Sequence, residues 1–347
     1  ARVIPCAKTV PAPPAVMTGQ GQAQRLQPTQ DADVAETWHL LQIVLPVFLV
    51  MGAGYALRRT RILTEEADQS LLGVLIKLFV PCLALDIIIG NEALVRPANL
   101  LLPPAAGFAS VAAGLAVSIL TAKLFLKGDA VKRTFACTTG LQNYSYIPLP
   151  LCLALFDREV VGVLFAFNLG VEVAMWSIVV ATVSGRQAGK RWWEPLWNPP
   201  IIAVVAAILL NLAGAESWIP TPVDTAWHML GQCAVPLGLL LSGALLADYA
   251  RPHVLRSGWR ATGLAIGLRL GVLPAILLAF ALMLPADPAL RSVLVVQAAM
   301  PSAVFPIVLA KIHRGDLPTA IRIVLGTSLV GLVTIPLWLA FGLRIIS

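Results

Sequence analysis

The sequence is poor in charged residues. Asp, Glu, Lys and Arg make up 12% of the 347 residues, whereas hydrophobic residues make up 58% and the mean hydropathy is +0.82. A typical soluble domain contains about 25% charged residues, so this chain has too few polar side chains to cover a soluble fold of its size. The long uninterrupted apolar runs are those of membrane-spanning helices rather than the alternating segments of a barrel. The composition therefore excludes a soluble globular protein and indicates an all-α polytopic membrane protein.

Several signatures of other protein classes are also missing. The five cysteines and four histidines show no metal-ligand spacing, so no metal site is expected. The sequence has no His-Glu-x-x-His motif, no paired aspartates within an apolar run and no serine-nucleophile signature, which argues against an intramembrane enzyme. The net charge of +7 comes without an aromatic-interleaved basic patch, so no nucleic-acid partner is expected.

The N-terminal segment differs from the rest of the chain. Residues 1–37 are rich in Pro, Gln, Ala and Thr and show no hydrophobic periodicity. They contain no apolar stretch of the kind found in a secretory signal. We expect residues 1–37 to form a disordered tail, to which no function is assigned.

Ten apolar runs of membrane-spanning length follow the tail. Their boundaries are 39–58, 69–90, 99–122, 134–156, 160–183, 199–215, 225–247, 258–284, 291–311 and 318–345. Alternate connections hold 16 Lys and Arg residues, whereas the other connections and the C-terminus hold only Arg96, Arg158, Arg291 and Arg344. By the positive-inside rule, the first set is cytoplasmic and both chain termini lie outside the cytoplasm. The expected location is the inner (plasma) membrane.

The topology divides the chain into two halves of five spans each. Residues 38–185 form the first half, residues 186–198 a cytoplasmic linker, and residues 199–347 the second half. With an odd number of spans per half, the two halves enter the membrane from opposite sides, which is an inverted repeat. A weak similarity supports this interpretation, because residues 80–85 resemble residues 235–240 at an offset of 155. The same offset relates Lys77 to Gln232.

Spans 4 and 9 contain helix-breaking residues at mid-membrane depth. Span 4 includes Gly140, Pro148 and Pro150, and span 9 includes Pro301 and Pro306. Proline removes a backbone donor and clashes with the preceding turn, so we expect both helices to be broken. Because unwound backbone in a membrane survives only against protein or a wet cavity, two such breaks in corresponding spans predict a transport site near the midplane. Half-helix N-termini at this site would favour an anionic group.

The same residues carry a resemblance to a known family. The segment Asn143-Tyr-Ser-Tyr-Ile-Pro-Leu-Pro150 resembles the span-4 motif of the auxin efflux carriers, and Asn198-Pro-Pro-Ile-Ile202 resembles the opening of their span 6. The segment Gln297-Ala-Ala-Met-Pro301 is similar to span 9 of the PIN-type members, and residues 231–243 are similar to span 7. The resemblance covers residues 40–345. Pro148 occupies the family's usual glycine position, and the short linker is typical of the compact, bacterial kind of carrier.

The resemblance implies a ten-span carrier of organic anions, with a scaffold domain and a transport domain in which broken spans 4 and 9 cross. Family members move auxin, or dicarboxylates similar to malonate and malate. The substrate-binding candidates, from the resemblance and from the polar residues of the spans, are Asn143, Tyr144, Ser145, Pro148, Pro150, Gln297, Pro301, Ser302, Pro306, Lys77 and Gln232.

Ionisable residues inside the spans are further candidates because their burial is costly. Glu172 shares a helix face with Asn168 and Trp176 and is a candidate for proton coupling, or else a structural partner of Lys77 or Arg269. Lys77 and Asp86 lie on opposite sides of one helix, so they cannot both line the site.

These features predict a secondary active or facilitative transporter of small organic acids that works by alternating access and is not an enzyme. No cofactor is expected apart from H⁺ or Na⁺ as a coupling ion. A sodium-dependent symporter of the bile-acid type on the same fold and a non-transporting membrane sensor are the alternatives. The expected partners are the organic acid, the lipid bilayer and a second copy of the chain bound through the scaffold helices.

Overall fold

The computed structural model describes residues 30–185, 196–249, 258–284 and 286–346, and the structural statements below concern these residues. Most of the predicted tail and of the predicted linker therefore lies outside the described residues. The first helix begins at Gln30, so residues 30–37, which the sequence analysis assigns to the tail, are helical.

The described residues are helical, and the isolated antiparallel bridge between Gln142 and Ser302 is the one sheet-like pairing among them. The helices of the first half, in chain order, are α1 (Gln30–Arg59), α2 (Glu65–Val74), η1 (Leu75–Phe79), α3 (Val80–Ile88), η2 (Glu92–Val95), α4 (Pro97–Phe125), α5 (Asp129–Gly140), α6 (Pro148–Leu155), α7 (Arg158–Ala174), η3 (Met175–Val179) and α8 (Val180–Ser184). Those of the second half are α9 (Pro199–Leu212), η6 (Ala215–Trp218), α10 (Thr221–Gln232), α11 (Ala234–Tyr249), α13 (Trp259–Gly267), η7 (Leu268–Val272), α14 (Leu273–Met283), α15 (Pro288–Ala299), α16 (Phe305–Ile312) and α17 (Leu317–Ile346).

Within this part of the chain, seven continuous helical stretches are long and apolar enough to cross a membrane. They correspond to predicted spans 1, 2, 3, 5, 7, 8 and 10. The other three predicted spans correspond to α9 and to the interrupted pairs α5–α6 and α15–α16, whose single helices are shorter. An all-helical membrane architecture is thus confirmed, whereas the count of ten spans stays a prediction.

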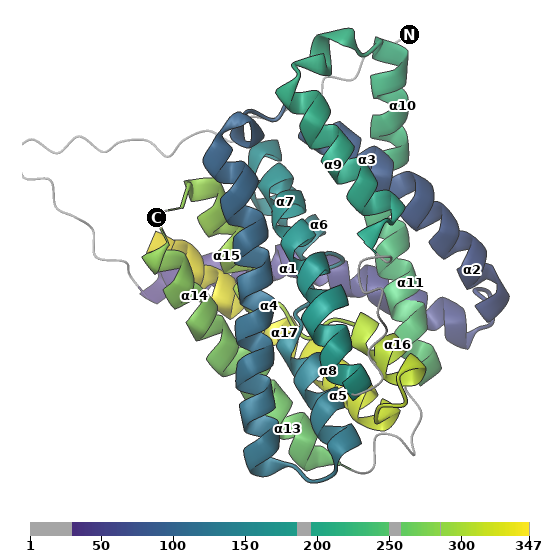
Figure 1. Cartoon of the computed structure of the whole chain (residues 1–347), viewed down its shortest axis with the longest axis vertical. Helices are drawn as coiled ribbons and strands as arrows, with labels where there is room; N and C mark the ends of the chain where they lie inside the picture. Colours follow the sequence, from purple (N-terminus) through teal and green to yellow (C-terminus); the bar gives the residue numbers. More distant parts are fainter. Residues whose placement is uncertain (1–29, 186–195, 250–257, 285, 347) are drawn as a thin grey trace, which may run out of the picture.

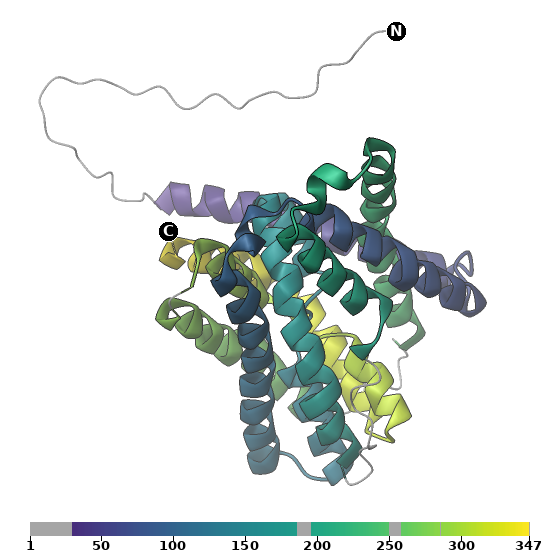
Figure 2. The same ribbon diagram turned by 45° about the horizontal axis from the view of Figure 1, so that its top comes forward.

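Long helices pack in pairs around the core (Figure 1). The helix α4 packs along α7, α1 packs along α11, and α3 lies between α9 and α10. The helix α15 packs against α14 and α17. In Figures 1 and 2 alike, α2, α9 and α10 lie on the opposite side of the molecule from α14.

Glycines allow two of these pairs to approach at backbone distance. A Cβ atom added to Gly170 of α7 would lie 1.8 Å from the Pro104 carbonyl oxygen of α4. A Cβ atom added to Gly243 of α11 would lie 1.9 Å from the Met51 oxygen of α1. Small residues at such contacts let membrane helices pack closely, which compensates for the absence of a hydrophobic driving force between helices in lipid.

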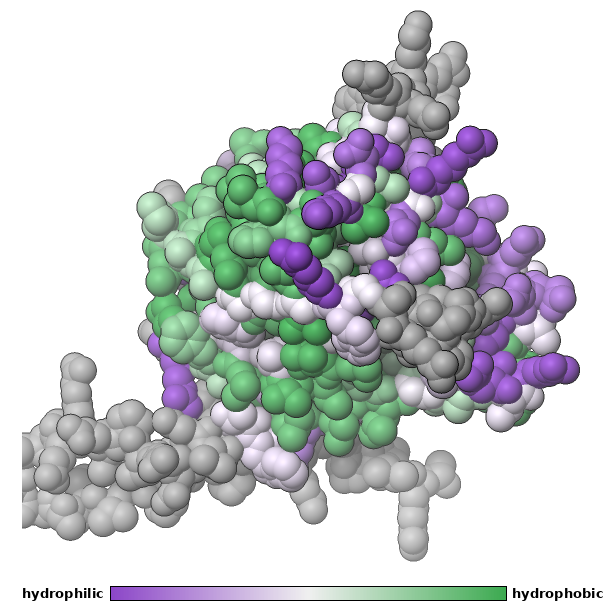
Figure 3. Space-filling model, turned by 90° about the horizontal axis from the view of Figure 1, so that it is seen from below, coloured by the Kyte–Doolittle hydropathy of each residue, from purple (hydrophilic) through white to green (hydrophobic). Residues whose placement is uncertain are grey.

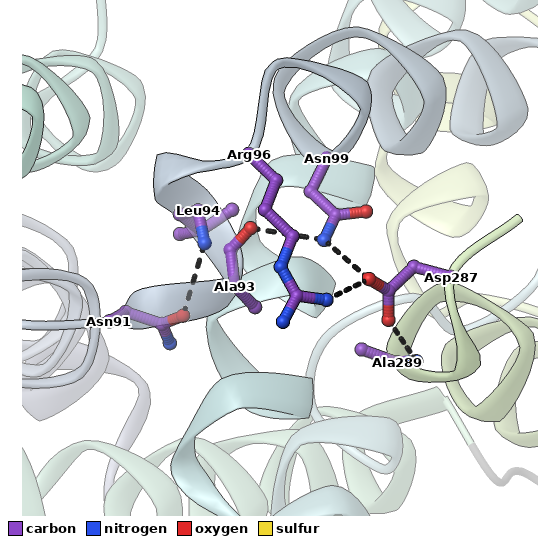
Figure 4. A network of polar contacts seen from close by, with 7 residues as sticks. All are labelled: Asn91, Ala93, Leu94, Arg96, Asn99, Asp287 and Ala289. Atoms are coloured by element: carbon purple, nitrogen blue, oxygen red, sulfur yellow. Dashed lines mark hydrogen bonds and ion pairs between the residues drawn. The ribbon is translucent and has the colours of Figure 1, made fainter.

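A polar network joins the start of α4 to the start of α15 (Figure 4). The carboxylate oxygen Oδ2 of Asp287 accepts hydrogen bonds from Arg96 Nη1 at 2.6 Å and from Asn99 Nδ2 at 3.3 Å. Its Oδ1 accepts a hydrogen bond from the Ala289 N–H at 3.1 Å and so caps α15. Partial burial raises the pKa of Asp287, but the hydrogen bonds from Ala289, Arg96 and Asn99 outweigh it, so the pKa lies below its ordinary value.

Candidate functional site

The helices of predicted spans 4 and 9 are interrupted where the prolines predict. In span 4, α5 ends at Gly140 and α6 starts at Pro148. In span 9, α15 ends at Ala299, and α16 starts at Phe305 with Pro306 in its first turn. Proline at the start of a helix costs no hydrogen bond because the first N–H groups have no helical acceptor, so each half-helix begins where its proline is tolerated.

The two interruptions lie against each other. The Asn143 N–H donates to the Pro301 carbonyl at 2.8 Å, and the Ala303 N–H donates to the Leu141 carbonyl at 3.0 Å. Gln297 Nε2 adds a hydrogen bond of 3.0 Å to the carbonyl of Tyr144. These contacts satisfy backbone groups that the breaks release, as a membrane interior requires.

A cavity of about 330 Å³ lies beside this contact. Its size is at the lower end of the range for small-molecule sites, so it suits a small ligand. The lining residues come from η1, α3, both interruptions, α7, η3 and the start of α9. They are Ile76, Val80, Asn143, Tyr144, Ser145, Tyr146, Glu172, Met175, Trp176, Asn198, Pro200, Ala303, Val304 and Phe305.

Glu172 is held by two hydrogen bonds at the cavity wall. Tyr144 Oη donates to its Oε1 at 2.7 Å, and Trp176 Nε1 donates to its Oε2 at 3.0 Å. The indole ring of Trp176 also packs edge-to-face on Phe305, with the ring centroids 5.5 Å apart. The carboxyl group of α7 is thereby tied to both interruptions, and neither Lys77 nor Arg269 is its hydrogen-bond partner in the described structure.

The two half-helix N-termini differ as anion sites. At α6, Pro148 and Pro150 have no N–H, and the Leu149 N–H already donates to the Ser145 carbonyl at 3.0 Å. Within the described residues, the N–H groups of Val304 and Phe305 at the start of α16 have no acceptor, and both residues line the cavity. Of the two half-helix N-termini expected to favour an anionic group, α6 therefore has fewer free donors, because prolines occupy two of its first three positions.

Asn143 adds a side-chain donor to the cavity. Its Oδ1 accepts a hydrogen bond of 3.4 Å from the Ile147 N–H, which supports the turn before α6. Its amide nitrogen has no acceptor among the residues that the structure describes. The amide group therefore has a free donor for a ligand while its oxygen is in use.

Other predicted site residues lie outside the cavity lining. Pro148, Pro150, Pro301 and Pro306 shape the interruptions, and Ser302 is fully buried, with its N–H bonded to Thr327 Oγ1 at 3.3 Å. The side-chain oxygen Oδ1 of Asn168 is buried without a partner in the described part of the chain.

Lys77 and Gln232 are also placed away from the site. Lys77 is exposed on η1, whereas its neighbour Ile76 faces the cavity. Gln232 lies 2.7 Å from His228 Nε2, and His228 Nδ1 lies 3.1 Å from Asp86 Oδ2. Residue spacing alone does not reveal the π-helical turn at η1, on which Lys77 lies.

Arg269 is a fully buried cation beside the second interruption. Its Nε donates to the carbonyl of Met300 at 3.0 Å, and Met300 caps the C-terminus of α15. A positive charge at this position stabilises the negative end of the half-helix dipole. Arg269 therefore stabilises the C-terminal end of α15 at the interruption.

Sequence reasoning missed most of the apolar cavity wall. Nothing in the sequence indicates that Met175, Val304 and Phe305 line the cavity, because apolar residues in a membrane span do not reveal which side of the helix faces a cavity. For Trp176 the sequence does contain such an indication, since Trp176 lies four residues after Glu172 on the same helix face. Asn198 and Pro200 had another in the Asn-Pro-Pro motif.

Comparisons with known proteins agree with this architecture. The model of a family described as "Membrane transport protein" matches the chain twice, over residues 39–191 and 186–339. An uncharacterized transporter of Methanothermobacter thermautotrophicus is 24% identical over 302 residues, covering 86% of this chain and 96% of the relative. An uncharacterized transporter of Methanocaldococcus jannaschii is 23% identical over 305 residues, covering 86% of this chain and 97% of the relative.

Proposed function

We propose that this chain, which belongs to the membrane transport protein family that includes the auxin efflux carriers, carries small organic anions across the plasma membrane by alternating access. The observation that carries the proposal is the cavity where the two interruptions meet. There, the free N–H groups of Val304 and Phe305 and the amide nitrogen of Asn143 are three donors without described acceptors. Hydrogen-bond donors and the positive end of a helix dipole both favour a carboxylate.

The two family matches support a repeated architecture. They divide the chain close to the predicted linker, and each contains one interrupted pair. We propose that the halves form an inverted repeat of five spans each, with both termini outside the cytoplasm. The distribution of Lys and Arg residues carries the assignment of sides.

We propose proton coupling through Glu172. An ionised Glu172 would repel an organic anion in this cavity, whereas a protonated Glu172 can donate its proton to the carboxylate of the ligand. Proton and anion would then cross together. Tyr144 and Trp176 hold the carboxyl group in place when no ligand is bound.

Binding is tested first by thermal shift with malonate, malate and indole-3-acetate, each with and without sodium at two pH values. A ligand that binds the folded protein raises its melting temperature. Asn143→Asp keeps the acceptor for Ile147 but replaces the free donor with a negative charge, so the ligand shift should disappear. Asn143→Ala should lose the shift too, whereas Gln232→Ala, outside the cavity, should keep it. An unchanged shift in Asn143→Asp would refute the site.

The coupling role is tested in proteoliposomes. Glu172→Gln should lose the pH dependence of uptake but retain exchange of labelled substrate, because an amide keeps the shape of the site without carrying a proton. Proton-driven uptake that survives in Glu172→Gln would remove this residue from the coupling step.

Sodium coupling is the second candidate, and one observation favours it. The side-chain oxygens Gln297 Oε1 and Ser302 Oγ are buried at the second interruption and have no hydrogen-bond partner among the described residues. Carriers coordinate Na⁺ with the carbonyls of unwound backbone, and these two side-chain oxygens could complete such a site. Uptake that requires sodium and is lost in Ser302→Ala, with Ser177→Ala as the half-buried control outside the interruption, would favour this candidate.

A further inference from the structure

A second cavity, separate from the proposed transport site, lies between α4, α5 and α8. Its volume is about 320 Å³. Three basic residues line it, namely Lys123 at the end of α4 and Lys132 and Arg133 in the first turns of α5. Asp129 is the one acidic residue in its lining, so the cavity has an excess of positive charge.

No carboxylate of the described residues neutralises these basic groups. In the described part of the chain, none of the three forms an ion pair with a carboxylate, Asp129 included. Arg133 Nε is buried and lacks a hydrogen-bond partner there. A buried guanidinium donor without an acceptor is costly, and a bound anion would satisfy it.

An apolar surface adjoins the basic cavity. Leu120 and Leu124 of α4 are 59% and 67% exposed, and Phe125 is 48% exposed. Leu120 and Leu124 are four residues apart and share a helix face. Leu120 lies three residues before Lys123, which places it about 4.5 Å further from the end of α4 along the helix axis. Figure 3 shows the molecule from the end at which α4 meets α5, where hydrophilic side chains gather next to hydrophobic surface.

We propose that this cavity binds the phosphate headgroup of an anionic phospholipid, with Arg133, Lys132 and Lys123 around the phosphate and an acyl chain along Leu120 and Leu124. Basic pockets between membrane helices on the cytoplasmic side bind anionic headgroups, and the distribution of positive residues predicts that side for the α4–α5 connection. A free phosphate would contact the basic residues but not the adjoining apolar surface of Leu120 and Leu124. This apolar surface is therefore the reason to prefer a lipid over a free phosphate as the ligand.

The arrangement of the basic residues explains the preference for a phosphate. A guanidinium group donates two parallel hydrogen bonds to phosphate oxygens, and lysine adds a point charge. The ligand needs no cofactor and undergoes no reaction. This inference is independent of the proposed transport function, because it uses none of the residues of the first cavity.

The test measures lipid binding to the detergent-solubilised full chain by native mass spectrometry and thermal shift. The probes are dioleoylphosphatidylglycerol, dioleoylphosphatidylcholine and inorganic phosphate. Phosphatidylglycerol should be retained and should raise the melting temperature, whereas the zwitterionic lipid and phosphate should do so much less. An equal shift with inorganic phosphate, or equal retention of both lipids, would overturn the proposal.

The variants separate the cavity from general charge effects. One basic residue near an anionic lipid contributes about fivefold in affinity, so Lys123→Gln should weaken phosphatidylglycerol binding about fivefold and Lys123→Gln/Arg133→Gln about 25-fold. The matched control, Arg59→Gln/Arg61→Gln, removes two exposed charges at and just after the end of α1 and should leave this binding unchanged. Lys123 is exposed, so its single variant should fold even if the double variant does not. Equal losses in test and control variants would also overturn the proposal.

Discussion

Replacing Gly170 by alanine tests the closest helix contact in the molecule's core. Gly170 lies in α7, two residues before Glu172. An added Cβ atom would lie 1.8 Å from the Pro104 carbonyl oxygen, 2.6 Å from its carbon and 2.9 Å from the Phe108 nitrogen. These are backbone atoms of α4, which cannot rotate away as a side chain can. The two helices would therefore have to separate by more than 1 Å over part of their length.

The magnitude follows from two opposing terms. Overpacking a close contact costs about 1–3 kcal/mol and occasionally more, while Gly→Ala inside a helix contributes up to about 1 kcal/mol in favour of folding. Because backbone atoms block the new methyl group, we expect the cost to exceed the gain. The Gly170→Ala protein should then have a lower melting temperature. One kcal/mol shifts the midpoint by about 2–4 °C in chains of about 150–250 residues, and the shift per kcal/mol is smaller in this chain of 347 residues.

The assay is thermal melting in detergent, with Gly263→Ala as the matched control. Gly263 is a helical glycine of α13 with no heavy atom within 4 Å of an added Cβ, so its replacement should leave the melting temperature unchanged or slightly higher. If Gly170→Ala melts as high as Gly263→Ala, then α4 and α7 do not pack at this distance, and the reasoning fails.

Three further predictions concern polar groups. Tyr144→Phe removes the hydroxyl that donates to Glu172 and should reduce proton-coupled uptake by about tenfold or more. The control Tyr146→Phe removes a cavity hydroxyl without a described partner and should change uptake little. Equal effects of the two variants in uptake assays would contradict the role of this hydrogen bond. Arg269→Met should destabilise the fold by about 1–3 kcal/mol because the Met300 carbonyl loses its donor, and Arg269→Lys should melt between this variant and the wild type. The pKa of Asp287 is lower in the folded than in the unfolded protein, so its carboxylate stabilises the fold above about pH 4, and this stabilisation is lost as the pH falls through the folded pKa. Asp287→Asn should thus melt lower than the wild type at pH 7, and the difference should shrink in acid.

The fold was largely accessible from hydrophobicity and from the prolines. Apolar runs predict where helices lie because a membrane interior admits little else. Pro148 and Pro301 predict the interruptions because proline inside a helix removes a backbone donor and clashes with the preceding turn. Proline alone is not sufficient, since Pro46, Pro103, Pro104 and Pro336 lie within continuous helices. The count of spans is less accessible, since α9 and the half-helices are each too short to span by length alone.

The site was only partly predictable, for a physical reason. The cavity is lined by four predicted residues, Asn143, Tyr144, Ser145 and Glu172. They could be predicted because polar groups inside a membrane are costly and therefore mark candidate functional sites. Lys77 lies on the π-helical turn η1 and is not among the residues that line the cavity, and the sequence of η1 does not signal this turn. Phe305 was missed because its role depends on tertiary packing against Trp176.

The pairing of Gln142 with Ser302 restricts how such a carrier can change shape. Two backbone hydrogen bonds, to Pro301 and from Ala303, fasten residues of the first half to residues of the second. In the proposed alternating access, these joined segments would move together with any bound substrate. The surface that slides during transport would then be the boundary between these joined segments and the helices around them. A ligand bound at that boundary would block transport without occupying the substrate cavity.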